Sequence, residues 1–383
     1  MSVRKFVGTL IIDGYGWQIE TGVIIESEWV APQITAEIVA SLPDAWAARP
    51  WRATDLIAAT LTVGYSDTYD VATYKLLVRR AEIDLVERRA SFSLASSDLI
   101  FERPIVDTIL PPFMPGATMA DCLSFYRSAQ EADLLAVVPS VIDESSGTVL
   151  PPDLDVSALT VTTPATGASW LEAVAQQTNT RVLVTRDGDW LVVDRDLDQL
   201  PPTFADFEWL SAYAVAADID ALLPDPAVAA DIDALLPVRS DIESVVLTST
   251  LDGWANSVSG LIEETTEGAV PPGPFVLSDP DVVTGSTPGG RWTYAITVGS
   301  RDDYSVSWPA EWETRVATVL ARLSEAGNTM EVQAVASSDA TPGAWARVKL
   351  REVDVTWQVE GLTTYIETAR QLATLRSRTG DIE

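Results

Sequence analysis

Residues 310–350 read AEWETRVATVLARLSEAGNTMEVQAVASSDATPGAWARVKL, a helical pattern followed by strand patterns. From Ala310 to Ala326 apolar residues recur every three or four positions, which is the period of a half-buried helix. These residues are Trp312, Val316, Val319, Leu320 and Leu323. Pro309 and Gly327 flank the segment, and both residue types are common at helix ends. The stretch therefore predicts one amphipathic helix.

Two alternating patterns follow this helix. Every second residue from Met330 to Ala336 is apolar, and so is every second residue from Ala346 to Leu350. The turn sequence Thr341-Pro342-Gly343 lies between them. Because strand side chains point alternately to opposite faces, both segments predict half-buried strands. We expect the helix to pack on a β-barrel or a curled sheet.

Length and composition indicate a folded protein. The chain has 383 residues, of which 47% are hydrophobic, and it contains 13 tryptophans. This is enough for two or three domains with sizeable cores and too apolar for disorder. The segment Met1 to Phe6 is followed by Gly8 and Asp13 rather than by an apolar run, so we expect neither a signal peptide nor membrane insertion. A single cysteine, Cys122, fits synthesis in a reducing host cytoplasm.

Charge and missing residue types limit the chemistry. With 56 acidic and 25 basic residues the net charge is −31, which disfavours specific nucleic-acid binding. The chain has no histidine. Catalysis by Ser-His-Asp or Cys-His arrangements and zinc sites that contain histidine are therefore excluded. Chemistry based on carboxylates, lysine or tyrosine remains open.

The first part of the chain, to about residue 110, predicts a small barrel or sandwich of short strands. Residues Lys75 to Ser96 predict a hairpin that turns at Glu87-Arg88-Arg89. Pro111-Pro112 then marks a plausible boundary.

Residues 117 to 200 predict an α+β module. Thr118 with Asp121, and Ser169 with Glu172, match the capping-box pattern of a helix start. Asp187-Gly188 lies between two apolar runs and predicts a hairpin with a type I′ turn, which needs two positive φ angles.

An internal repeat follows the α+β module. The sequence AVAADIDALLP occurs at 214–224 and again at 227–237, a period of 13 residues. Two short copies are too few for a solenoid, so we interpret them as a duplication within an acidic connection. A docking role for the repeat is an alternative.

These patterns predict a mainly β protein with two small β-barrel-like domains and an inserted α+β module. The expected order is an N-terminal barrel-like domain at 1–112, an α+β module at 113–202, an acidic connector at 203–243 and a C-terminal barrel-like domain with one packed helix at 244–383.

Acidic pairs and tryptophans are candidate sites with simpler explanations. Carboxylate pairs could bind metal or act as a glycosidase, but clustering by chance explains them better in so acidic a chain. The pairs are Asp218/Asp220, Asp231/Asp233 and Asp279/Asp281. Several tryptophans could stack on sugars, although packing in a core or interface is the expected role. They are Trp46, Trp51, Trp308, Trp312, Trp345 and Trp357. We therefore assign no catalytic, cofactor-binding or metal-binding residue.

One concentrated basic patch stands out from the acidic background. It consists of Arg79, Arg80, Arg88, Arg89 and Arg103. Its expected partner is an acidic surface, either of the same protein or of a neighbouring subunit.

The order of these parts resembles the tail hub proteins of bacteriophages, also called baseplate hub or minor tail proteins. The segments that carry the resemblance are KLLVRRAEIDLVERRASFSLASSDLIFERP, GASWLEAVAQQTNTRVLVTRDGDWLVVDR, IESVVLTSTLDGWANSVSG and the quoted helix-and-strand stretch with WQVEGLTTYIETARQLATL after it. The duplicated segment and the Gly/Pro-rich loop near 271 to 290 depart from the family pattern.

The resemblance implies a non-enzymatic structural protein of the virion tail tip. It implies a homotrimer whose barrels form a ring around the DNA exit path, active in DNA ejection. The implied partners are the distal tail protein, the tape measure protein and a central fibre or spike. The alternatives are a carbohydrate-binding adhesion protein of the virion and a glycosidase that uses carboxylates.

Overall fold

The computed structural model describes residues 6–28, 32–44, 46, 57–65, 71–102, 116–129, 140–145, 147, 149–150, 167–178, 180–194, 205–210, 242–249, 257–263, 275–278, 293–300, 316, 320, 328–350 and 353–376. The chain divides into two compact units. The first comprises residues 1–96, 200–248 and 328–383, and the second comprises 97–199 and 249–327.

The N-terminal strands of the first unit form a closed antiparallel barrel. The six strands pair in the order β1-β4-β5-β6-β3-β2, and β2 pairs again with β1 to close the ring. Their bounds are β1 Phe6–Ile12, β2 Tyr15–Ser27, β3 Ile34–Ser41, β4 Ala58–Tyr65, β5 Val71–Asp84 and β6 Arg89–Ala95. In β3, buried residues alternate with more exposed ones, as the period of a half-buried strand requires. The hairpin predicted across residues 75 to 96 is confirmed as β5–β6, but its turn lies at residues 85–88 rather than at 87–89, and Arg89 already belongs to β6.

Strands from the C-terminal part of the first unit form a second ladder, the C-terminal ladder. Its order is β10-β16-β17-β18-β15-β11, and β10 runs parallel to β16. The bounds are β10 Phe207–Leu210, β11 Ile242–Ser249, β15 Asn328–Val335, β16 Trp345–Lys349, β17 Asp354–Tyr365 and β18 Arg370–Arg376. The strand patterns predicted at 330–336 and 346–350 are confirmed as β15 and β16. The two strands do not pair with each other, since β15 pairs with β18 and β16 pairs with β17.

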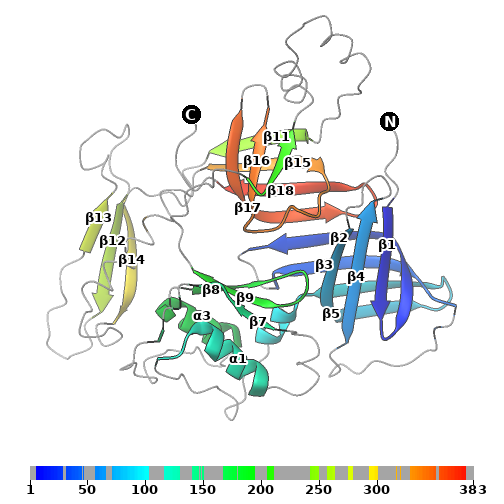
Figure 1. Cartoon of the computed structure of the whole chain (residues 1–383), viewed down its shortest axis with the longest axis horizontal. Coiled ribbons are helices and arrows are strands. Elements are labelled where there is room, and N and C mark those ends of the chain that lie inside the picture. Colours follow the sequence, from blue (N-terminus) through cyan, green and yellow to red (C-terminus); the bar gives the residue numbers. More distant parts are fainter. Residues whose placement is uncertain are drawn as a thin grey trace, which may run out of the picture. The chain divides into compact units, whose positions relative to one another are not determined.

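The barrel and the ladder share one continuous sheet because β2 and β17 pair with each other (Figure 1). The first part of β2 pairs with β1, and the first part of β17 pairs with β16. Beyond these segments, residues 23–27 of β2 pair antiparallel with residues 361–365 of β17. A bulge interrupts each strand between the two pairings, at Glu20 in β2 and at Glu360 in β17. Because a bulge bends a strand and increases its twist, it lets one strand serve two sheets.

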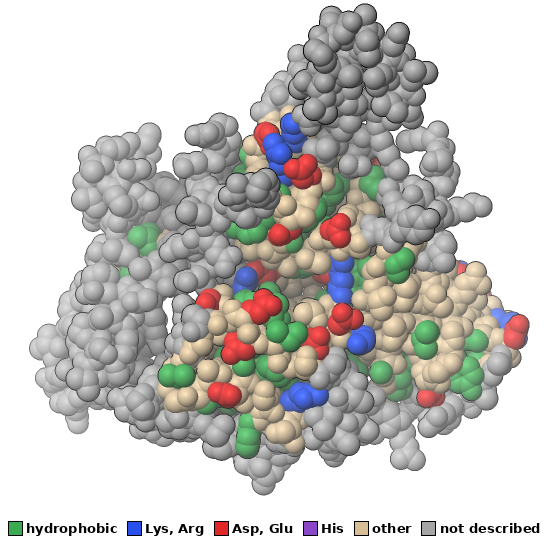
Figure 2. Space-filling model, in the orientation of Figure 1, with side chains coloured by type: hydrophobic (Ala, Val, Ile, Leu, Met, Phe, Trp, Pro, Cys, Tyr) green, Lys and Arg blue, Asp and Glu red, His purple; other side chains and the backbone are tan. Residues whose placement is uncertain are grey.

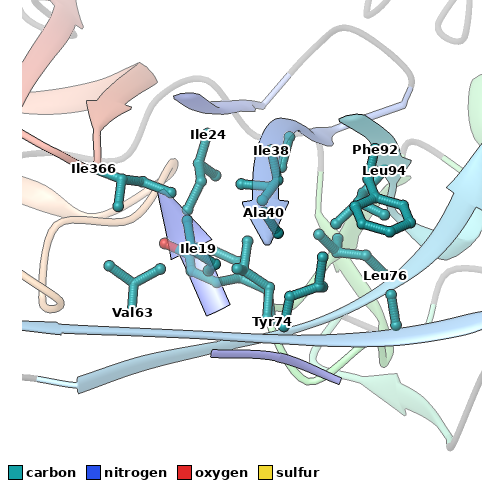
Figure 3. Close-up of a cluster of buried hydrophobic side chains, with 14 of the residues drawn as sticks. Ile19, Ile24, Ile38, Ala40, Val63, Tyr74, Leu76, Phe92, Leu94 and Ile366 are labelled. Atoms are coloured by element: carbon teal, nitrogen blue, oxygen red, sulfur yellow. The ribbon is translucent and has the colours of Figure 1, made fainter. Parts of the chain in front are cut away.

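The barrel interior is filled by a cluster that also includes residues from the C-terminal part of the chain (Figure 3). Ile366, from the turn after β17, is fully buried beside Ile24 and Val63. At the other end Trp17 packs against Phe92, with ring centroids 4.9 Å apart, and against Trp46 at 5.9 Å. The C-terminal ladder has its own core, which includes Trp209, Met330, Val332, Ala346, Val348, Trp357 and Leu375.

The second unit contains the α+β segment that lies in the chain between β6 and β10. It consists of the 3₁₀ helix η1 Ser97–Glu102, the helices α1 Met119–Ala129 and α3 Gly167–Thr178, and the strands β7 Val141–Asp143, β8 Thr180–Val184 and β9 Trp190–Asp194. Four aromatic rings form its centre: Phe101, Tyr126, Trp170 and Trp190. The Trp190 indole donates a hydrogen bond of 2.9 Å to Ser97 Oγ, which satisfies the buried N–H.

Helix starts in this segment follow the predicted patterns in part. The capping box at Thr118 is confirmed, since the Thr118 N–H donates to Asp121 Oδ2 at 3.0 Å and the Asp121 N–H donates to Thr118 Oγ1 at 3.1 Å. Helix α3 begins at Gly167, earlier than the predicted start at Ser169. The side chains of Ser169 and Glu172 lie outside the described residues.

The Asp187-Gly188 hairpin is confirmed as β8–β9, but its turn type differs from the prediction. Gly188 has a φ of 85°, and the positive φ angles of the described residues do not include Asp187. The Gly188 N–H donates to Thr185 O at 2.9 Å, and Thr185 N–H donates to Asp189 O at 3.0 Å. This is a three-residue loop with glycine in the left-handed position. A type I′ turn occurs instead at Asp13-Gly14, between β1 and β2, where φ is 52° and 80°.

The rest of the second unit includes a three-stranded sheet in the order β13-β12-β14. Its strands are β12 Ser257–Glu263, β13 Phe275–Ser278 and β14 Thr293–Ser300.

Of the predicted helix at 310–326, Val316 and Leu320 are described, and both are helical and buried. Trp312, Val319 and Leu323 lie outside the described residues, as does the whole repeat at 214–237.

The predicted fold class is confirmed, because the structure is mainly β with a closed barrel, further strands and an α+β segment. The exact domain boundaries given above remain a prediction.

Replacing Trp17 with Ala should lower the free energy of unfolding by about 3–5 kcal/mol, because the fully buried ring leaves a cavity. Among the described residues its indole N–H has no hydrogen-bond partner. Trp17→Phe should therefore be clearly milder than Trp17→Ala. Urea denaturation of the two variants tests this, and equal losses would contradict the cavity argument.

Replacing Gly22 with Ala should destabilise the first unit by about 1–3 kcal/mol through overpacking. A Cβ at Gly22 would lie 2.6 Å from Ile38 Cδ1 and 3.0 Å from the Glu37 carbonyl oxygen. The matched control is Gly16→Ala in the same strand, where a Cβ meets nothing within 4 Å. Thermal denaturation should show a lower melting temperature for Gly22→Ala alone.

Candidate functional site: an assembly surface

The basic hairpin predicted from the sequence projects beyond its neighbour β4. Residues 71–77 of β5 pair with β4, whereas the pairing of β5 with β6 continues to Asp84 opposite Arg89. A bulge at Arg79 separates these two parts of β5. We call residues 79–89 the hairpin arm.

Three arginines of the arm form ion pairs with carboxylates of the same chain. Arg80 pairs with Glu82, Arg88 Nη2 lies 2.7 Å from Asp44 Oδ1, and Arg89 Nε donates to Glu20 Oε2 at 2.8 Å. For these three side chains, acidic partners thus lie within the same protein, which is one of the two kinds of partner expected from the sequence. Arg79 is exposed at the bulge, and Arg103 lies outside the described residues.

The pair between Glu20 and Arg89 links the bulge of β2 to the arm at its last strand pair before the turn. Hydrogen bonds from Arg89, and then from the Ser41 hydroxyl at 2.7 Å, hold the pKa of Glu20 below its usual value. Because the pair faces solvent, its contribution to stability is small. In several places on the face shown in Figure 2, basic side chains likewise lie beside acidic ones.

The tip of the arm carries two exposed aliphatic side chains that the sequence analysis missed. Leu85 is 60% exposed and Val86 is 93% exposed. Asp84 Oδ1 accepts hydrogen bonds of 2.8 Å from the backbone N–H groups of Val86 and Glu87, and Arg88 closes the turn with a φ of 56°. The sequence feature that could have revealed this exposed tip is the pair of bulky aliphatic residues at a turn, where glycine, asparagine and aspartate are usual.

The tryptophans proposed as sugar-stacking residues are packed against the protein where they are described. Trp345 is 7% exposed, Trp357 is 4% exposed, and Trp46 is partly buried against Trp17. Trp51, Trp308 and Trp312 lie outside the described residues. The described tryptophans thus follow the packing role.

The candidate acidic pairs at 218/220, 231/233 and 279/281 also lie outside the described residues. Within the part of the chain that is described, no group of three or more acidic or cysteine side chains is arranged to hold a metal ion.

Burial raises the pKa of the Cys122 thiol to about 11, so this thiol is protonated at neutral pH. None of the helices in the described part is long and apolar enough to span a membrane.

A small hollow in the first unit is lined by Ile24, Val63, Tyr74, Ser337, Thr364 and Gln371. Its polar groups bond to the protein itself. The Gln371 amide accepts from Ser337 N and donates to Ser337 O, both at 3.0 Å, and also donates to Thr364 Oγ1 at 3.1 Å. The Tyr74 hydroxyl donates to Glu26 Oε1 at 3.0 Å. These contacts fix the strands of the barrel and the ladder, which is a structural role.

One arginine joins three strands of the C-terminal ladder. Arg347 of β16 makes two hydrogen bonds of 2.8 Å to the carboxylate of Asp354 in β17, and Nη1 donates to Glu208 of β10 at 3.1 Å. The hydrogen bonds from Arg347 lower the pKa of Asp354, and the two carboxylates raise the pKa of Arg347. The forked guanidinium thereby fixes the parallel β10–β16 pair at the end of the ladder.

This arrangement of a closed barrel, further strands and an α+β segment is similar in fold to phage tail proteins of known structure. The chain is similar to the tail protein from Neisseria meningitidis MC58, with a TM-score of 0.62 and 14% identity over 97% of both chains. It is also similar to the 43 kDa tail protein of prophage MuSo2 from Shewanella oneidensis, with a TM-score of 0.58 and 10% identity over 97% of both chains.

A further similarity is to the prophage tail protein gp18 from Listeria monocytogenes EGD-e, with a TM-score of 0.51 and 8% identity over 98% of this chain and 95% of that one. At such identities the likeness is one of fold. No protein-family model matches the chain, and no curated protein matches its sequence. The resemblance to phage tail proteins is thus confirmed at the level of the fold.

The Asp354–Arg347 pair should make stability depend on pH. Because the pKa of Asp354 is lowered on folding, its contribution is present above the usual aspartate value of about 3.9 and is lost as the pH falls through the folded pKa. Asp354→Asn should therefore lower the free energy of unfolding at pH 7. Near pH 3 the free energies of unfolding of the variant and the parent should differ less. Urea midpoints across this range measure it, with the exposed Asp339→Asn as the control. A constant difference at every pH would contradict the linkage.

Proposed function

We propose that the chain is a structural hub protein of a bacteriophage tail tip, without enzymatic activity. Three copies form a ring that joins the tail tube and distal tail ring to the central fibre or spike. The observation that carries the proposal is the fold likeness to phage tail proteins along nearly the whole chain, 97% for the first two.

The shared sheet supports a ring-forming role. Each chain contributes one closed barrel and the C-terminal ladder, joined by backbone pairing between β2 and β17. In the proposed trimer the barrel and the ladder alternate around the axis, so that three copies give a ring with six positions. The domain boundaries at 112, 202 and 243 belong to this proposal, as does a connecting role for the segment 203–243, whose strand β10 also pairs with β16.

The net charge of −31 supports a position around the DNA exit path. An acidic wall repels the phosphate backbone, so DNA slides past during ejection without binding specifically. The further partners we propose are the distal tail protein and the tape measure protein. The protein is made in the host cytoplasm and is incorporated into the virion at the tail tip.

The adhesion alternative requires aromatic rings that face solvent in a groove. Trp345 and Trp357 are buried instead, and the partly buried Trp46 packs on Trp17. The glycosidase alternative rests on acidic pairs outside the described residues. The hub function is therefore the one that the described side chains favour.

Two measurements test the hub proposal. Native mass spectrometry of the purified full chain should show three copies. Particles labelled with an antibody against the protein should carry the label at one end of the tail when imaged. A chain that stays monomeric at all concentrations, or a label spread along the tail, would count against the hub.

A further inference from the structure

The tip of the hairpin arm is an apolar spot at the apex of an ordered hairpin. Leu85 and Val86 are adjacent, and their exposed fractions are 60% and 93%. Single exposed aliphatic residues are common on protein surfaces. Two of them at a turn, where polar residues and glycine are the usual choice, are unfavourable for an isolated chain and favour a role in contact with a partner.

The tip is held in one conformation by the hydrogen bonds and the ion pair of its turn residues. Two hydrogen bonds of 2.8 Å to Asp84 Oδ1 fix the backbone at Val86 and Glu87. The Arg88 carbonyl accepts a hydrogen bond of 2.8 Å from Leu42 N–H, and the Arg88 side chain pairs with Asp44. A contact made through such a preorganised turn loses little conformational entropy on binding.

Local charge indicates which partner the tip fits. The arm contains four arginines and three acidic residues, whereas the whole chain carries a net charge of −31. Arg80 and Arg88 keep 73% and 56% of their side chains exposed despite their ion pairs. Because a guanidinium has five N–H donors, the exposed Arg80 and Arg88 can each bind a further carboxylate, and another copy of this strongly acidic chain supplies such groups.

We propose that the hairpin arm docks onto a second copy of this chain, with Leu85 and Val86 buried at the contact and Arg80 and Arg88 facing acidic side chains of that copy. This inference rests on the proposed self-assembly and names the surface that mediates it. The contact is mainly apolar at its centre and charged at its rim, which is the usual arrangement of a protein interface.

A matched pair of valine variants tests the docking role. Val86 and Val71 are both exposed and lie at opposite ends of the β5–β6 hairpin, with Val71 56% exposed. Val86→Asp should weaken association of the full chain about tenfold or more, measured by light scattering and native mass spectrometry. Val71→Asp should associate like the parent, and the conservative Val86→Ile should retain association. Unchanged circular dichroism and melting temperature check that each variant folds.

Cross-linking identifies the partner directly. A photoreactive maleimide attached to Val86→Cys should cross-link two copies of the chain, and Cys122 is buried. If the parent forms an oligomer and Val86→Asp forms it equally well, the docking role is overturned while the hub proposal stands. Cross-links in intact particles that reach only other tail proteins or DNA also overturn it. A parent chain that never associates contradicts both proposals.

Discussion

The pairing of β2 with β17 is the contact on which the first unit depends. It joins strands from opposite ends of the chain, and the neighbouring hydrogen bond from Gly22 N–H to Glu367 Oε2 spans 345 residues of sequence. Through this pairing the core of the barrel receives Ile366 from the C-terminal turn. Closure of such a long loop costs entropy, which the backbone ladder and the buried side chains must offset together.

Close packing at this junction explains why particular small residues and bulges occur there. Gly22 lies where β2 leaves β1 and meets β17, and the Ile366 N–H donates to its carbonyl oxygen at 3.0 Å. A side chain at Gly22 would contact Ile38 and the Glu37 backbone. The bulges at Glu20 and Glu360 place the change of partner at corresponding points of the two strands. Arg89 pairs with Glu20, so the hairpin arm is attached near its turn to one of these bulges.

Local patterns were predictable wherever short-range physics decides the structure. The capping box at Thr118 and the β5–β6 and β8–β9 hairpins depend on residues only a few positions apart. The predicted turn type at Gly188 was wrong because an Asp-Gly sequence suits both a two-residue type I′ loop and the three-residue loop that the structure contains. The partners of the arginines could not be predicted, since Asp44 and Glu20 lie beside the arm only because β3 pairs with both β6 and β2.

The sequence by itself determined the strand alternation, the acidic charge, the absence of histidine chemistry and the mainly β class, because these depend on residue type and local period. The tertiary structure alone decided that β2 pairs with β17, that the described tryptophans pack against the protein and that Val86 stands exposed at a fixed tip. Strand partners are chosen by contacts between segments far apart in sequence, and alternation within one strand carries no information about which strand lies beside it.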